Sequence, residues 1–169
     1  MKQRIWIFIL YSVTLSILFS YENKFSFSSI AGGDKISLSH TYELTEISDG
    51  YTRLVQIGDG HTAEPGIPEL PLYTTFFMLD PSKTYEFQFD ILASYTIEDI
   101  KILPHQGMEK WEIDEVSIIN EDVYNSYTPY PAQNMVVSER MQGRGIEFVS
   151  IQVIPYKYYP KYEKLEVYS

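Results

Sequence analysis

The chain of 169 residues contains no cysteine. Disulfides are therefore excluded, and an exported form of this chain would have to be stabilised by its hydrophobic core alone. A cysteine nucleophile and thiolate metal sites are excluded by the same absence. Any catalysis by this chain would have to use other residue types.

Basic residues are also scarce. The chain has 13 Lys and Arg against 23 Asp and Glu, which gives a formal net charge of −10. Nucleic-acid binding needs a positively charged face to meet phosphate, so we expect no nucleic-acid partner. An acidic balance suits solubility or an encounter with a cationic partner, but it does not select one.

Motifs for catalysis and metal binding are missing from the sequence. It has no G-x-S-x-G nucleophile elbow and no glycine-rich phosphate loop followed by a helix. The three histidines are His40, His61 and His105, and no spacing brings two of them together. His61 and Glu64 lie in a Pro/Gly loop, which does not give the helical H-E-x-x-H geometry. The acidic runs 114–115 and 121–122 lack calcium-loop spacing. We expect no catalytic residue, no metal and no cofactor.

The N-terminus is typical of a secretory signal peptide. Lys2 and Arg4 precede an apolar run from Ile5 to about Ser20, which is shorter than the roughly 20 apolar residues of a membrane span. The cleavage site is poor, because Ser20 is small but Leu18, two residues earlier, is not. The alternative is a signal anchor that is retained. Loss of Lys2 and Arg4 would change the net charge from −10 to −12. We expect residues 1–20 to be removed, leaving a periplasmic, extracellular or cell-surface protein outside the membrane.

The remaining residues predict a linker and one domain. The small, polar stretch Ser26–Gly33 indicates a linker over 21–35, and the hydrophobic content of 44% is enough for a core over 36–169. Short β-rich runs follow one another along this domain: 40–47 and 51–57 around a Ser-Asp-Gly turn, then 72–79, 85–91, 97–103, 115–119, 135–139, 146–154 and 165–168. Among these, Tyr85–Ile91 shows the clearest alternation of apolar and polar residues.

This spacing of strands predicts the fold class. Many short strands at intervals of about 8–12 residues favour an all-β domain, an antiparallel β-sandwich or jelly roll. One helical turn is plausible within 109–116, and Tyr124–Gln133 is expected to be a structured loop. The sequence ends directly after a strand, so we expect a domain truncated at its C-terminus or one domain of a longer precursor.

Two prolines stiffen the segment Gly66-Ile67-Pro68-Glu69-Leu70-Pro71-Leu72-Tyr73. Each proline favours extended geometry in the residue before it and offers no N–H to a ladder. The segment is therefore predicted to be an extended approach to a strand at a sheet edge.

Tyrosine is frequent, with 15 residues. The second half of the chain contains Tyr124, Tyr127, Tyr130, Tyr156, Tyr158, Tyr159 and Tyr162. Packing in the core and at strand edges is one interpretation, consistent with β propensity. A stacking platform for sugar rings is the other.

Several segments in order resemble the gingipain-type propeptide, the N-terminal prodomain of secreted cysteine peptidases. They are 66–73 with Gly66, Pro68, Leu70 and Pro71; 99–107 with Pro104 and Gly107; the Tyr-rich loop 124–131; Arg144-Gly145 before an apolar strand; and Pro155, Tyr158 and Pro160 followed by 165–168. Together they cover roughly 42–168. Tyr159 departs from the family, where Asn is often found, and the peptidase domain itself is missing.

The resemblance implies a β-sandwich that packs on the peptidase, assists its folding and keeps it latent. Latency in such a family is expected to use a basic side chain that enters the specificity pocket, where a guanidinium makes a bidentate pair with a carboxylate. The candidates are Arg140 and Arg144, with Lys110 as a weaker third. A structural role, such as an ion pair between Arg144 and Glu147, is the alternative.

Three hypotheses about function remain. The first is a non-catalytic propeptide whose partner is the cognate cysteine peptidase domain, in cis and downstream of Ser169. The second is an exported β-sandwich that binds glycan or protein at the cell surface. The third is a propeptide-like remnant without a peptidase. The reading frame after Ser169 would distinguish them.

Overall fold

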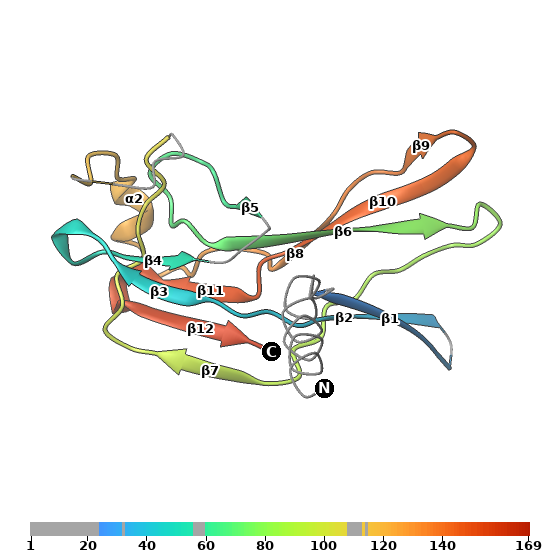
Figure 1. The fold of residues 1–169 in the computed structure, drawn as a ribbon, viewed down its shortest axis with the longest axis horizontal. Helices are drawn as coiled ribbons and strands as arrows, with labels where there is room; N and C mark the ends of the chain where they lie inside the picture. The colour runs from blue at the N-terminus through green and yellow to red at the C-terminus, as the bar shows by residue number, and fades with distance from the viewer. Residues whose placement is uncertain (1–23, 32, 56–59, 108–112, 114) are drawn as a thin grey trace, which may run out of the picture. The chain divides into compact units, whose positions relative to one another are not determined.

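The computed structural model describes residues 24–31, 33–55, 60–107, 113 and 115–169 (Figure 1). The chain divides into two compact units, 1–39 and 40–169, which are treated separately below. Every ladder between the named strands is antiparallel. The predicted all-β, antiparallel class is therefore confirmed. Within the described ranges, no helix has the length and apolar character needed to cross a membrane.

The first unit contains a hairpin of two strands, β1 (Phe25–Ile30) and β2 (Gly33–Leu38). Their register runs from Phe25 opposite Leu38 to Ile30 opposite Gly33. This hairpin occupies residues that were expected to be a linker. The alternation of Phe25 and Phe27 with serines is the strand signal that the linker interpretation overlooked. The predicted signal peptide, 1–20, lies outside the described residues.

The described residues of the second unit form three sheets and three short helices. The five-stranded sheet has the order β5-β6-β10-β8, with β9 also paired to β10. Its strands are β5 (Gly60–His61), β6 (Pro71–Leu79), β8 (Met135–Val137), β9 (Met141–Gly143) and β10 (Ile146–Val153). The three-stranded sheet orders β11 (Tyr156–Tyr159), β12 (Lys164–Tyr168) and β7 (Ser94–Ile97), and β3 (Glu43–Glu46) pairs with β4 (Thr52–Val55). The helices are η1 (Ser48–Gly50), α2 (Glu121–Tyr124) and η2 (Pro160–Tyr162).

Several strand predictions are confirmed. The Ser-Asp-Gly segment joins β3 to β4 as a hairpin turn. Strand β6 covers the predicted run 72–79, and β10 covers residues 146–153 of the predicted run 146–154. Strand β10 pairs with β6 on one side and with β8 and β9 on the other, so it is the central strand that its apolar sequence predicts.

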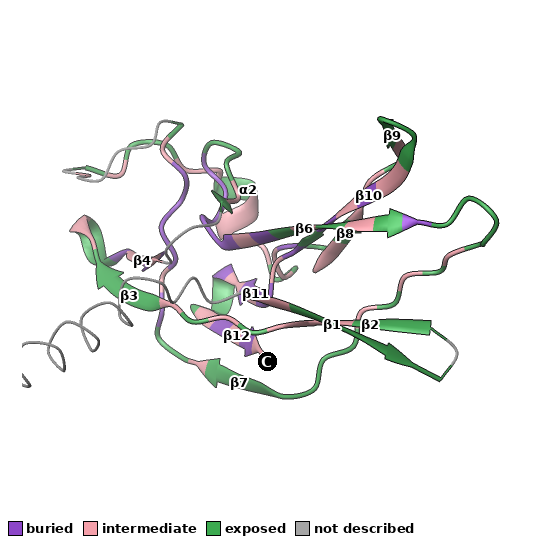
Figure 2. Cartoon of the chain, turned by 45° about the vertical axis from the view of Figure 1, so that its right-hand side comes forward, coloured by how far each residue is buried: buried purple, intermediate pink, exposed green. Residues whose placement is uncertain are grey.

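The core of this unit takes side chains from both larger sheets. Tyr73 of β6, Tyr156 and Tyr158 of β11 and Leu165 of β12 are fully buried. Figure 2 shows the buried residues in β11, β12, the first half of β6 and the segments beside them. Residues 74–78 of β6 and all of β9 are exposed or half-buried, although Leu79 at the end of β6 is buried. One end of the sheet is therefore anchored in a sandwich-like core, and the other end extends beyond that core.

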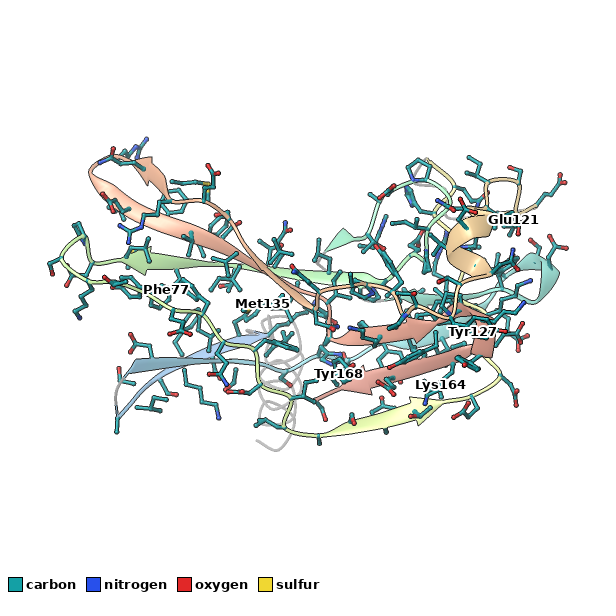
Figure 3. The ribbon with its side chains drawn as sticks, turned by 180° about the vertical axis from the view of Figure 1, so that it is seen from behind. Phe77, Glu121, Tyr127, Met135, Lys164 and Tyr168 are labelled. Carbon is teal, nitrogen blue, oxygen red and sulfur yellow. The ribbon has the colours of Figure 1, made fainter. Side chains whose placement is uncertain are left out.

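The predicted strand Tyr85–Ile91 is wrong as a ladder strand. No residue from 84 to 93 belongs to a strand of the structure. The burial still alternates, with Tyr85, Phe87 and Phe89 less exposed than their neighbours. The rings of Tyr85 and Phe87 contact Phe77 on β6, which Figure 3 labels, at centroid distances of 5.6 and 5.9 Å. The pattern correctly predicted an extended segment with two different faces. Packing of its side chains on β6, and not a backbone ladder, fixes its position.

The predicted strand Glu115–Ile119 is also absent. The side-chain amide of Gln106 takes the place of a partner strand: its Oε1 accepts from the backbone N–H groups of Ser117 and Ile118, each at 3.0 Å. The helical turn predicted over 109–116 lies mostly outside the described residues. A short helix, α2, forms further on instead, where the Asn120 side chain caps the N–H of Val123.

Candidate functional site

The prolines of the segment 66–73 line up with a second proline segment. Pro68 lies opposite Pro104 in an isolated antiparallel bridge. On either side, Glu69 N donates to Leu103 O at 2.8 Å and His105 N donates to Ile67 O at 2.9 Å. The two prolines therefore occupy the position of this pairing where no N–H is required. The extended geometry predicted for this segment is confirmed.

The other residues of the family-like motifs have scaffold positions. Leu70, Pro71 and Tyr158 are fully buried, and Pro160 is buried at the start of η2. Pro155 is buried, and Gly107 and Gly145 have positive φ in turns. All of these residues support turns or the core. None of them is a candidate for chemistry.

A two-residue turn joins β9 to β10 and consists of Arg144 and Gly145. Gly143 pairs with Ile146, and both turn residues have positive φ, 52° at Arg144 and 79° at Gly145. These dihedrals belong to the primed turns of tight hairpins, which favour Asn-Gly or Asp-Gly. An arginine in the first position is unusual, and a left-handed conformation costs a residue with a Cβ roughly 1–2 kcal/mol. Residues kept in such a conformation often serve a function.

The two candidate arginines differ in their partners. Arg140 Nη1 lies 3.6 Å from Glu147 Oε2, so this arginine makes the hairpin's ion pair with Glu147. Arg144 is exposed, and its guanidinium has no ion pair or hydrogen bond with any residue that the structure describes. The expected alternative role, a bridge from Arg144 to Glu147, is wrong. Lys110, the third candidate, lies outside the described residues.

An exposed apolar face continues from this turn along the sheet. Phe76 and Met78 on β6 are 61% and 69% exposed, and Ile146 on β10 is 49% exposed. The rings of Phe76 and Phe148 contact edge to face at 5.9 Å, and Phe148 pairs with Met78 in the ladder. Clustered exposed hydrophobic side chains are typical of protein interaction surfaces.

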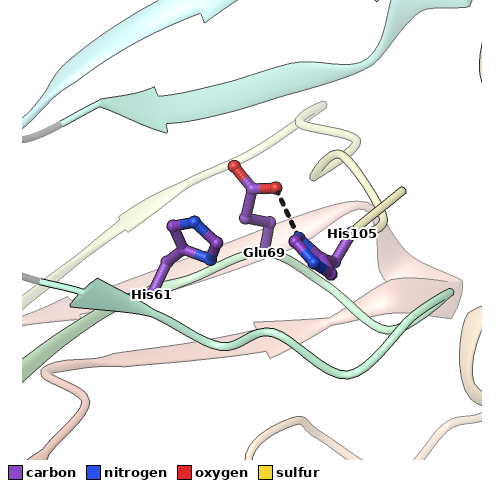
Figure 4. Close-up of side chains that lie close together, drawn as sticks. All are labelled: His61, Glu69 and His105. Atoms are coloured by element: carbon purple, nitrogen blue, oxygen red, sulfur yellow. Dashed lines mark hydrogen bonds and ion pairs between the residues drawn. The ribbon is translucent and has the colours of Figure 1, made fainter. Parts of the chain in front are cut away.

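The expectation that no two histidines meet is wrong. The rings of His61 and His105 lie 5.2 Å apart, and Glu69 lies beside them (Figure 4). His105 Nδ1 is 3.2 Å from Glu69 Oε2, and Arg53 Nε is 3.0 Å from Glu69 Oε1. Sequence reasoning missed this cluster because its members lie in segments that are far apart in the chain. A glutamate between two prolines in an apolar segment was the available signal.

His40 has a structural role instead. Its Nε2 lies 2.7 Å from the carbonyl oxygen of Tyr168, and its Nδ1 lies 3.1 Å from the Tyr156 hydroxyl. A neutral ring that donates through Nε2 and accepts at Nδ1 satisfies both contacts. This agrees with the expectation of a hydrogen-bonded histidine.

The tyrosines do not form one platform. Tyr156 and Tyr158 are core residues, and burial raises the pKa of Tyr158 to about 12 and that of Tyr156 further. Tyr127 and Tyr162 are exposed and form an edge-to-face pair at 5.6 Å. Figure 3 labels Tyr127 near the end of the unit that carries α2. Core packing thus accounts for the tyrosines of β11, and one exposed pair is too small for a sugar-binding surface.

Comparisons with known proteins agree with the resemblance found in the sequence. The family model Propeptide_C25 matches residues 40–169. The complex of the pro- and mature domains of RgpB from Porphyromonas gingivalis matches with a TM-score of 0.65 and 18% identity, over 86% of this chain and 80% of the other. A structure on the zymogenic latency of gingipain K from the same organism matches with a TM-score of 0.54 and 16% identity, over 86% and 75%. No curated protein matches the chain.

Proposed function

We propose that this chain, which belongs to the C25 propeptide family, blocks its peptidase by inserting Arg144 into the peptidase's specificity pocket. The chain is a non-catalytic latency propeptide of a gingipain-like cysteine peptidase, and its partner is the peptidase domain of the same precursor. The identity of the blocking side chain is the new element of the proposal.

The difference between the two arginines is the observation that carries this proposal. Arg144 projects from a tight turn, is exposed and has no partner within the described part of the chain, whereas Arg140 is paired with Glu147. A guanidinium that is free before docking gives up no ion pair when it enters an acidic pocket. The positive φ of Arg144 also costs stability, which a function at this position would explain.

The exposed apolar face supplies the rest of the proposed contact. Phe76 and Met78 lie on β6, which pairs with β10, and Ile146 is the residue of β10 that directly follows the Arg144 turn. An apolar surface next to a charged anchor matches the usual anatomy of tight interfaces, in which hydrophobic burial surrounds one or two buried arginine or aromatic anchors. The apolar face of the sheet would thus contact the peptidase, and the β9–β10 hairpin would present Arg144 to its specificity pocket.

Inhibition in trans tests the role of Arg144. The purified chain and its R144A and R140A variants would be titrated against the mature cognate peptidase. Loss of a buried charge pair should raise the inhibition constant of R144A by about 30-fold or more, whereas R140A should change it by less than about threefold. Equal inhibition by R144A and the unmodified chain would contradict the proposal, and a large loss confined to R140A would transfer the role to that residue.

We also propose that residues 1–20 export the precursor and are then removed. Gingipain propeptides belong to secreted precursors, and the apolar run behind Lys2 and Arg4 supports a signal peptide. The resulting location is the periplasm or the cell surface. N-terminal sequencing of the exported protein tests this, and an intact Met1 on membrane-bound material would contradict cleavage.

A further inference from the structure

His61, Glu69 and His105 form a cluster that latency does not require. One nitrogen of each histidine and one oxygen of Glu69 all lie within 4.8 Å of one another. Glu69 and His105 are buried, at 7% and 5% exposure, and His61 is half-buried on the edge strand β5. Figure 4 shows the two imidazole rings on either side of the Glu69 side chain.

An ion network explains only part of this cluster. Arg53 and His105 contact the two oxygens of Glu69 at 3.0 and 3.2 Å, which satisfies the buried carboxylate. His61 takes no part in that network. Its Nδ1 lies 3.0 Å from the carbonyl oxygen of Thr62, so Nδ1–H donates there and Nε2 keeps its lone pair. A histidine that is oriented by a backbone carbonyl is the usual form of a metal ligand.

The backbone around the cluster is held by hydrogen bonds. Thr62 N donates to Leu70 O at 2.9 Å, and the Thr62 hydroxyl donates to Pro68 O at 2.7 Å. These bonds connect the residue after His61 to both neighbours of Glu69. His105 N in turn donates to Ile67 O at 2.9 Å. The three side chains therefore project from segments tied directly to one another, as a preorganised site requires.

We propose that His61, Glu69 and His105 bind a Zn²⁺ ion. Two imidazoles and one carboxylate form a donor set that suits zinc and does not suit calcium or magnesium, which prefer oxygen ligands. Zinc–ligand distances of about 2.0–2.2 Å place tetrahedral ligand atoms about 3.4 Å apart. The separation of 3.2 Å between His105 Nδ1 and Glu69 Oε2 already fits that edge. The widest separation, up to 4.8 Å, would close by rotation of His61 at the sheet edge.

Arg53 has a defined part in this site. Its Nε lies 3.0 Å from Glu69 Oε1, which leaves Oε2 directed at His105 and at the ion. Arg53 would therefore act as the outer partner that orients the ligating carboxylate. Its positive charge opposes cation binding, so we expect an affinity below that of zinc sites with several thiolates.

Zinc titration of the full chain, freed of metal by a chelator, tests the proposal. Calorimetry should show one Zn²⁺ per chain, and Co²⁺ in its place should give the visible absorption of a tetrahedral site. The H61A variant should bind at least about tenfold more weakly. The matched control is E64Q, an exposed acid in the same loop, which should bind as the unmodified chain does.

The decisive variant is H61A, because His61 is half-buried at an edge and carries none of the core. H105Q should also lose binding, but its buried position makes a folding defect possible, so H61A decides if H105Q does not fold. Absence of stoichiometric binding at micromolar Zn²⁺ would overturn the proposal. So would binding that H61A leaves unchanged, or binding that E64Q abolishes.

Discussion

The backbone N–H of Asn120 donates a hydrogen bond of 2.9 Å to the carbonyl oxygen of Gly66, and the two residues are in direct contact. A Cβ added at Gly66 would lie 2.9 Å from that same nitrogen. Gly66 also has a φ of 84°, and its own N–H donates to His105 O at 2.8 Å. One glycine therefore joins the proline segment, the His105 segment and the residue that caps α2.

Replacing Gly66 by alanine should therefore destabilise the domain by more than the cost of a positive φ alone. The left-handed conformation costs alanine roughly 1–2 kcal/mol, and the backbone contact with Asn120 adds to that. Gly145 is the matched control, because its φ is 79° but a Cβ there would meet no atom within 4 Å. Urea denaturation should show a larger loss for G66A than for G145A. Equal losses would mean that the contact with Asn120 is readily relieved.

The Arg144 turn predicts opposite effects on stability and function. Asparagine tolerates positive φ in tight hairpins, so R144N should raise the free energy of unfolding by about 0.5–1 kcal/mol. The same variant should lose inhibition about as strongly as R144A. Urea denaturation and the inhibition constant, measured on one preparation, check both effects. R140N is the control, and a variant of Arg144 that is less stable and inhibits normally would contradict the functional interpretation.

The two faces of β6 predict different effects of substitution. A change on the exposed face should weaken peptidase binding, and a change on the packed face should lower the stability of the domain. Met78 is 69% exposed, so M78T should hardly change the free energy of unfolding but should weaken inhibition about tenfold. Phe77, the adjacent residue on the opposite face, packs against Tyr85 and Phe87. F77A should therefore destabilise the domain by about 2 kcal/mol or more. A stable M78T variant with unchanged inhibition would exclude this face from the interface.

The strands of the second unit show how far the fold can be predicted from the sequence. The continuous apolar runs 72–79 and 146–154 are strong enough to predict β6 and β10, and the Asp-Gly turn predicts the β3–β4 hairpin. The segment 85–91 alternates between apolar and polar residues but forms no ladder, because alternation defines two faces and does not supply a pairing partner. At 115–119, the side chain of Gln106 satisfies the backbone in place of a strand. Such a long-range side-chain bond leaves no periodic signal.

The candidate sites show the same limit. The pair Arg144-Gly145 is visible in the sequence as the entry to an apolar strand, but the turn that it forms, its positive φ and the pairing of Glu147 with Arg140 are not. The cluster of His61, Glu69 and His105 depends on the pairing of two proline segments, which brings residues 36 apart into contact. Local patterns therefore identified the two arginines as candidates, whereas the hairpin that carries them and the polar cluster required the tertiary structure.

The buried ion network predicts a large effect of removing its acid. Glu69 is 7% exposed and lies between Arg53 and His105. E69Q would leave the Arg53 guanidinium without its carboxylate, so we expect a loss of about 3–5 kcal/mol in the free energy of unfolding. Thermal and urea denaturation without metal would measure it. The E64Q variant, in the exposed part of the same loop, should be unchanged, and equal stability of E69Q would show that water replaces the carboxylate.

The buried tyrosines predict alkaline unfolding. The pKa of Tyr158 is raised from 10.0 to about 12 by burial, because its neutral form is favoured in the folded chain. The folded pKa lies above the unfolded one, so the unfolded chain releases its proton first as the pH rises. The associated stability is complete below pH 10 and is lost between pH 10 and 12, by about 1.4 kcal/mol per pH unit for each such tyrosine. Tyr124 and Tyr156 have pKa values raised further by burial, so they add to the same slope.

Circular dichroism against pH, combined with phenolate absorption, would measure this transition. Unfolding and ionisation should coincide for the buried tyrosines. The Y158F variant removes one titrating group, together with a hydroxyl that accepts from Ile102 N at 3.3 Å. It should therefore be less stable at neutral pH and lose stability less steeply above pH 10. A slope as steep as that of the unmodified chain would mean that Tyr158 does not titrate with unfolding.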